Sequence, residues 1–83
     1  MGHAAGSYQY ITFFRARNPE VFYVEGSFNQ TFKDSCLKPR KARWDPENKR
    51  WEVQKEHLHE VKQEAKFAFD TVYYGEGGDY VTL

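Results

Sequence analysis

The sequence predicts an all-β fold in one small domain. Runs rich in β-branched and aromatic residues recur along the 83-residue chain, and clusters of Asn, Pro, Asp and Gly separate them. Seven Phe, six Tyr and two Trp supply large rings, which suit a small core and also make flat binding platforms. The length leaves room for one hydrophobic core and for no second domain.

The first predicted strands lie near the N-terminus. Residues 1–7, MGHAAGS, are small and are expected to form a flexible leader, so that the domain spans residues 8–83. Residues 8–17 are strand-like, RNPE at 17–20 is a turn signal, and residues 21–25 form a second strand-like run. We expect these two runs to form a hairpin or to lie in facing sheets.

The middle of the chain is polar and contains Pro39 and Pro46. DPEN at 45–48 has the residues that favour a β-turn. Short edge strands are expected around Leu37 and at Arg43-Trp44.

Residues 51–66, WEVQKEHLHEVKQEAK, are ambiguous. Helix formers dominate, and Leu58, Val61 and Ala65 would share a helical face. With a period of two, however, Trp51 and Val53 would lie on the buried side of a strand. Composition alone favours the helix. Further strands are expected at 66–74 and 79–83, joined by the flexible GEGG turn at 75–78.

Charge and cysteine content exclude several classes of protein. Lys and Arg (12) balance Asp and Glu (12), whereas nucleic-acid-binding domains usually carry a basic excess, so no nucleic-acid partner is expected. Cys36 is the one cysteine and cannot form an internal disulfide, which favours a reduced, cytoplasmic protein. No apolar run approaches the ~20 residues that span a bilayer, and no membrane partner is expected.

Three stretches carry a resemblance. EVFYVEGSFNQTF (20–32), NKRWEV (48–53) and EAKFAFDTVYY (64–74) occur in the order and spacing typical of one family. The chain over roughly residues 10–83 resembles the glycogen- and starch-binding domains of the AMP-activated protein kinase β-subunit type. The resemblance implies an immunoglobulin-like (early-set) antiparallel β-sandwich with residues 51–66 extended. It also implies a non-catalytic carbohydrate-binding module that binds an α-glucan such as glycogen or starch.

The same resemblance implies roles for individual residues. Gly26 would allow a sharp bend that returns Phe28 to the core and leaves Asn29 at a loop tip with a free amide. The family's first stacking tryptophan falls at Thr31, with Phe32 next to it, and the second falls at Tyr73; Lys66 matches a lysine that donates to sugar oxygens. The predicted carbohydrate-binding residues are Asn29, Phe32, Lys66 and Tyr73.

Simpler roles for these and other residues remain open. Tyr73 is also a natural strand residue and Lys66 a natural edge lysine. Trp51 fits the core, and Trp44 fits either an exposed position or a hydrophobic cover over the loop.

Nothing in the pattern indicates an enzyme. No Ser/His/Asp set, paired-carboxylate site or phosphate loop stands out, and no cofactor is expected. His57 and His59 lack a third donor, so no metal site is expected. The alternative to sugar binding is a protein-interaction or structural module within a larger intracellular assembly or parent chain, in which sugar binding has been lost.

Overall fold

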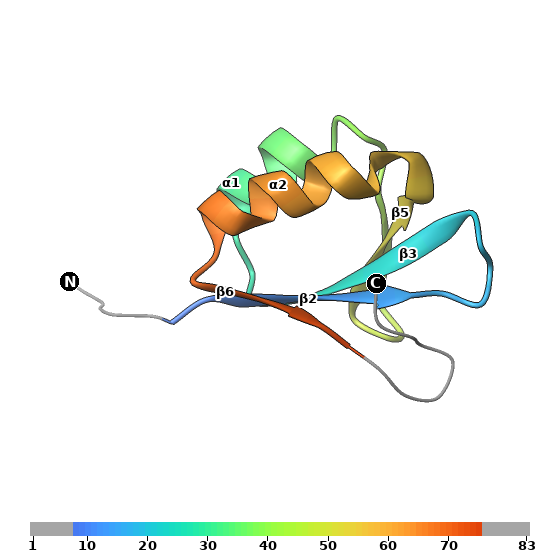
Figure 1. The fold of residues 1–83 in the computed structure, drawn as a ribbon, viewed down its shortest axis with the longest axis horizontal. Coiled ribbons are helices and arrows are strands. Elements are labelled where there is room, and N and C mark those ends of the chain that lie inside the picture. Colours follow the sequence, from blue (N-terminus) through green and yellow to red (C-terminus); the bar gives the residue numbers. More distant parts are fainter. Residues whose placement is uncertain (1–7, 76–83) are drawn as a thin grey trace.

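The computed structural model describes residues 8–75, which build one five-stranded sheet with helices along one face (Figure 1). The strands are β2 (Tyr10–Arg15), β3 (Val21–Gly26), β4 (Arg43–Asp45), β5 (Arg50–Gln54) and β6 (Thr71–Tyr74). Their order across the sheet is β4-β5-β3-β2-β6. The predicted leader at 1–7 and the predicted last strand at 79–83 lie outside the described residues.

The sheet is mixed. β2 and β3 pair antiparallel, with Phe13 opposite Val24, and so form the hairpin that was one of the two expected arrangements. β3 and β5 are also antiparallel, as are β5 and β4. β6 lies parallel to β2 at the other edge, with Tyr10 opposite Thr71.

Four helical segments form the second layer. They are α1 (Gln30–Phe32), the π-helical η1 (Lys33–Leu37), the 3-10 turn η2 (Lys55–His57) and α2 (Leu58–Ala68). The core lies between these helices and the sheet. Its buried members are Ile11, Phe13, Phe22, Val24, Val53, Phe32, Cys36, Leu37, Val61, Ala65 and Phe69.

The prediction that residues 51–66 are extended is wrong beyond residue 54. Residues 51–54 belong to β5, but the chain is helical from Lys55 to Ala68. Val61 and Ala65 are fully buried and Leu58 packs against the core, so the helical face visible in the sequence is the face that packs. The strand predicted from residue 66 starts only at 71, and the strand expected around Leu37 is helical.

These corrections define the fold class. The prediction of a small β-rich domain is confirmed. Within residues 8–75, however, the layer facing the sheet is helical, and the second sheet of an immunoglobulin-like sandwich is not seen there. No helix in this part of the chain has the length and apolar character required to cross a membrane.

Candidate functional site

The bend at the end of β3 requires glycine. Gly26 has φ = 151°, a backbone conformation that other residues rarely adopt. A β-carbon on Gly26 would overlap the carbonyl oxygen of Tyr10 and lie 2.8 Å from the Cα of Ile11. Ser27 secures the bend, because its N–H donates to the Tyr10 carbonyl (2.9 Å) and its Oγ accepts from the Tyr10 N–H (3.0 Å). The predicted structural role of Gly26 is therefore confirmed.

After this bend the chain enters a helix, and Asn29 is its N-cap. Its Oδ1 accepts a hydrogen bond from the Phe32 N–H (2.9 Å). Its Nδ2 donates to Oε1 of Gln9 (3.1 Å) and to the carbonyl of Ala68 (3.3 Å). The prediction of a free amide at a loop tip is wrong, since both halves of the amide hold segments of the protein together.

The helix also decides which phenylalanine enters the core. Phe28 comes before the cap and is 68% exposed, whereas Phe32 is only 4% exposed. The Phe32 ring packs edge-on against Phe69, with 5.0 Å between ring centroids. The prediction that Phe28 returns to the core is wrong, because the first helical turn brings Phe32 inward instead. Phe32 has no open ring face for a sugar.

The other two predicted binding residues lie on different layers. Lys66 is exposed on helix α2. Tyr73 is 48% exposed on β6. Its neighbour Val72 packs against the core on the helical side, so alternation along the strand directs Tyr73 to the opposite face of the sheet. The structure does not bring Asn29, Phe32, Lys66 and Tyr73 onto one surface.

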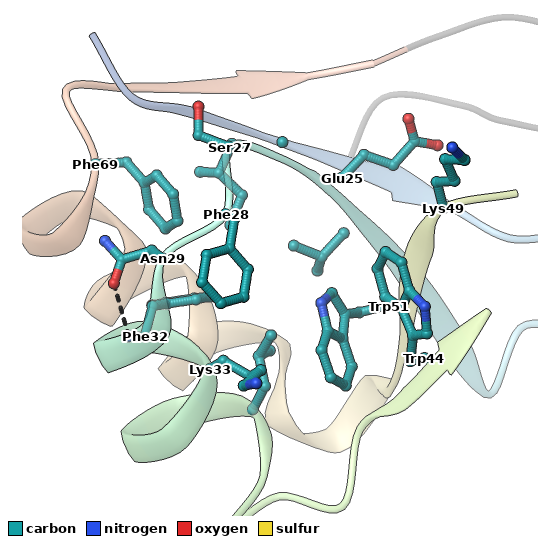
Figure 2. A pocket seen from close by; sticks show the side chains of 14 residues that line it. Glu25, Ser27, Phe28, Asn29, Phe32, Lys33, Trp44, Lys49, Trp51 and Phe69 are labelled. Atoms are coloured by element: carbon teal, nitrogen blue, oxygen red, sulfur yellow. Dashed lines mark hydrogen bonds between the residues drawn. The ribbon is translucent and has the colours of Figure 1, made fainter. Parts of the chain in front are cut away.

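A pocket of about 100 Å³ lies at the end of the sheet (Figure 2), and of the four predicted binding residues Asn29 and Phe32 are in its lining whereas Lys66 and Tyr73 are not. We call it the aromatic groove. It lies where the helices leave part of their side of the sheet uncovered. The side chains that give it its character are Glu25, Phe28, Lys33, Trp44, Lys49 and Trp51.

Two tryptophans from neighbouring strands line this groove. Trp44 pairs with Trp51 across β4 and β5, and Trp51 pairs with Val24 of β3. The two indoles are 5.2 Å apart at an angle of 56°. Trp51 is half-buried against the core, whereas Trp44 is 49% exposed. The Trp51 ring therefore supports an accessible Trp44 ring.

The opposite wall begins at the bend. Phe28 follows Gly26 and Ser27 and reaches the same opening (Figure 2). Nζ of Lys33, from η1, lies 5.3 Å from the centroid of the Phe28 ring. The EGSFN segment that carries the resemblance thus forms part of the groove.

Charged groups stand around these rings. Glu25 comes from β3, Lys33 from η1, and Lys49 from the turn between β4 and β5. Among the residues that the structure describes, neither lysine is ion-paired. Lys49 has φ = 54°, in the left-handed region that favours glycine or asparagine. The groove combines apolar rings with two available ammonium groups.

Sequence reasoning missed the groove because it considered Trp44 and Trp51 separately. The DPEN turn was predicted correctly, since residues 46–49 form a turn between β4 and β5. Trp44 and Trp51 stand at matching distances on either side of that turn. In a hairpin, such residues become cross-strand neighbours, and this spacing was the signal for an indole pair.

Aromatic residues also gather on the open face of the sheet. Tyr8, Tyr10 and Tyr73 form what we call the tyrosine patch. The Tyr10 and Tyr73 rings meet edge-on at 6.2 Å. The Tyr8 hydroxyl donates to Oγ1 of Thr71 and lies 3.3 Å from the Tyr73 hydroxyl. The hydrogen bond between the Tyr8 and Tyr73 hydroxyls, and then the charge of Tyr8, raise the pKa of Tyr73.

Comparisons with known proteins add no relative. A scan against protein-family models, a search of curated proteins and a search of solved structures each found no match for this chain.

Proposed function

We propose that this chain is a non-catalytic carbohydrate-binding domain that holds an α-glucan weakly in the aromatic groove. The observation that carries the proposal is the Trp44 ring, half-exposed and supported by Trp51 beside a pocket. A pyranose ring presents an apolar C–H face, and a fixed, accessible indole is a suitable surface for it. Because Trp51 already positions the indole, little side-chain freedom is lost on binding.

The polar rim suits the rest of a sugar. Lys33 and Lys49 supply donors and Glu25 supplies acceptors, and these are the groups that hydroxyls need. The choice of an α-glucan comes from the resemblance of the EGSFN segment to glycogen-binding domains. The proposal depends on the local groove that this segment helps to build, and not on the immunoglobulin-like sandwich that the resemblance also implies.

The expected affinity is low. The pocket is small, the groove is open to solvent, and exposed hydrogen bonds contribute little net free energy. We expect dissociation constants between millimolar and high micromolar, or roughly −4 to −6 kcal/mol.

The test is an amide chemical-shift titration with maltoheptaose, followed through the indole N–H signals as well. Trp44→Ala should weaken binding by about fivefold, because the stacked ring contributes on the order of 1 kcal/mol. Tyr73→Ala is the matched control, an exposed aromatic residue on the other face of the sheet, and should bind like the parent. If Trp44→Ala stays folded and binds fully while Tyr73→Ala loses binding, the groove is not the site.

The tyrosine patch favours a second candidate function, a protein-interaction module. Three neighbouring rings with hydroxyls at their tips form a surface that is apolar in its body and polar at its edge, as is common at protein interfaces. Two observations together would favour this candidate over glucan binding. The indole N–H signals would not shift at millimolar maltoheptaose, and the protein would self-associate in a way that Tyr10→Ala abolishes.

A further inference from the structure

We propose that the groove selects an anionic saccharide, a glucan carrying a phosphate or carboxylate group, and that Lys49 binds the anionic group. This inference rests on the proposed function and specifies the chemistry of its ligand. The glucan would stack on the tryptophans as before. The charged substituent would distinguish it from a neutral chain.

The charges at the groove are unequal. Lys33 and Lys49 stand against the single carboxylate of Glu25. Neither ammonium group is ion-paired within residues 8–75, whereas the ammonium group of Lys38, at the C-cap of η1, lies 3.8 Å from the carboxylate of Asp34. A ligand that fills the groove therefore meets two ammonium groups and one carboxylate among the lining side chains, a local excess of positive charge.

The backbone at Lys49 provides an independent observation. A residue at φ = 54° is more stable as glycine or asparagine than as lysine. Lys41 has a similar φ of 60° outside the groove, so the conformation of Lys49 supports a functional role only together with its place in the groove lining.

The Lys49 side chain is not what closes the turn. Oδ1 of Asp45 accepts hydrogen bonds from the N–H groups of Glu47 (3.1 Å) and Asn48 (3.3 Å). The side chain of Asn48 also donates to Asp45 (2.9 Å). With the turn secured in this way, an exposed lysine that lines the groove has its ammonium group left for a ligand.

Lys33 strengthens the site from the other wall. Lys33 is a half-buried residue of η1, and its ammonium group lies 5.3 Å from the centroid of the Phe28 ring. An anionic group seated between the walls would therefore meet charge from two directions, one lysine on the helical layer and the other on the sheet.

Lys41 is a natural control for Lys49. It is also a lysine at positive φ, 60°, but it is not among the residues that line the groove. Lys49→Gly and Lys41→Gly each remove one positive charge and relieve the same kind of backbone strain. Only Lys49→Gly removes a positive charge from the groove.

The experiment compares four probes by calorimetry or chemical-shift titration on the full chain: maltoheptaose, phosphorylated maltoheptaose, a glucuronate oligosaccharide and inorganic phosphate. At low salt, at least one anionic saccharide should bind about fivefold more tightly than maltoheptaose, as expected for an exposed charge pair. That preference should shrink as salt is added. The tighter anionic saccharide identifies the charged group.

The variants complete the test. Lys49→Gly should melt at or above the temperature of the parent and lose the preference, whereas Lys41→Gly should show a similar thermal change and keep it. Equal binding of neutral and anionic saccharides, or equal effects of the two variants, would overturn this inference and leave the proposed function standing. Inorganic phosphate binding as tightly as the phosphorylated glucan would also overturn it. Failure of every saccharide to bind would refute the proposed function itself.

Discussion

Gly26→Ala tests the central local feature of the fold with the addition of one methyl group. The new β-carbon would overlap the Tyr10 carbonyl oxygen and approach the Ile11 Cα at 2.8 Å. Both neighbours belong to the backbone of β2 and cannot rotate away. The alanine would also have to adopt φ = 151° or force the bend to open.

The magnitude follows from these two effects. A residue held in a backbone region reserved for glycine costs about 1–3 kcal/mol. If the bend opens instead, the two hydrogen bonds between Ser27 and Tyr10 are lost, at about 1 kcal/mol each. We therefore expect a loss of about 1–3 kcal/mol, a large share of the roughly 4–12 kcal/mol typical of a domain this size.

Urea denaturation followed by tryptophan fluorescence measures this loss. Gly75→Ala is the comparison variant, because its β-carbon would overlap the Phe14 ring, a side chain and not backbone, and Gly75 is not at positive φ. We expect this variant to lose less stability than Gly26→Ala, because a ring can rotate away whereas the β2 backbone cannot. A Gly26→Ala protein within about 0.5 kcal/mol of the parent would show that the bend places no special demand on this residue.

Two further predictions concern Asn29 and Cys36. Asn29→Ala removes the α1 cap and the hydrogen bonds that the amide donates to Gln9 and Ala68. It should lower the free energy of unfolding, measured by urea denaturation, by about 1–3 kcal/mol. Asn29→Asp should lose less stability, because its carboxylate keeps the acceptor of the cap. Burial, and then the charge of Glu64, raise the pKa of Cys36 to about 12, so an aromatic disulfide reagent at pH 8 should react only as fast as the protein unfolds. The Cys36 thiol ionises at lower pH in the unfolded chain than in the folded protein, so its contribution to stability should be present below pH 9 and fall as the pH rises towards 12. Comparison of the pH dependence of unfolding with that of Cys36→Ala checks this. Rapid labelling of the folded protein would contradict the raised pKa on which both statements depend.

The hairpin, its glycine bend and the DPEN turn could be predicted because each depends on neighbouring residues. Gly26 and the 45–48 turn are local demands of the backbone, and the β2 and β3 runs have few helix formers. The helix over 58–68 was also visible in composition. It was missed because the resemblance outweighed the helical face that includes Val61 and Ala65.

The candidate site was harder to predict, for a reason that Asn29 makes plain. Asparagine is favoured both at loop tips and at helix N-caps, because its amide bonds to nearby backbone in either case. Choosing the loop directs Phe28 inward, whereas choosing the cap directs Phe32 inward. Because the loop was chosen over the cap, Phe28 was predicted to be buried and Phe32 to be exposed, which is the reverse of the structure. The exposed ring of Phe28 in the wall of the groove was therefore not predicted.

The parallel pairing of β6 with β2 has a consequence for how the chain is made. Tyr10 of β2 pairs with Thr71 of β6. This edge of the sheet therefore cannot form until the ribosome has synthesised almost all of the described residues. The Gln9 carbonyl accepts from the Asp70 N–H (2.9 Å), which joins the same distant segments. Contacts this far apart in sequence slow folding, because a long loop must be ordered before they form. The β2–β3 hairpin and α2 are made of local contacts and are suited to form first, leaving β6 to complete the described sheet later.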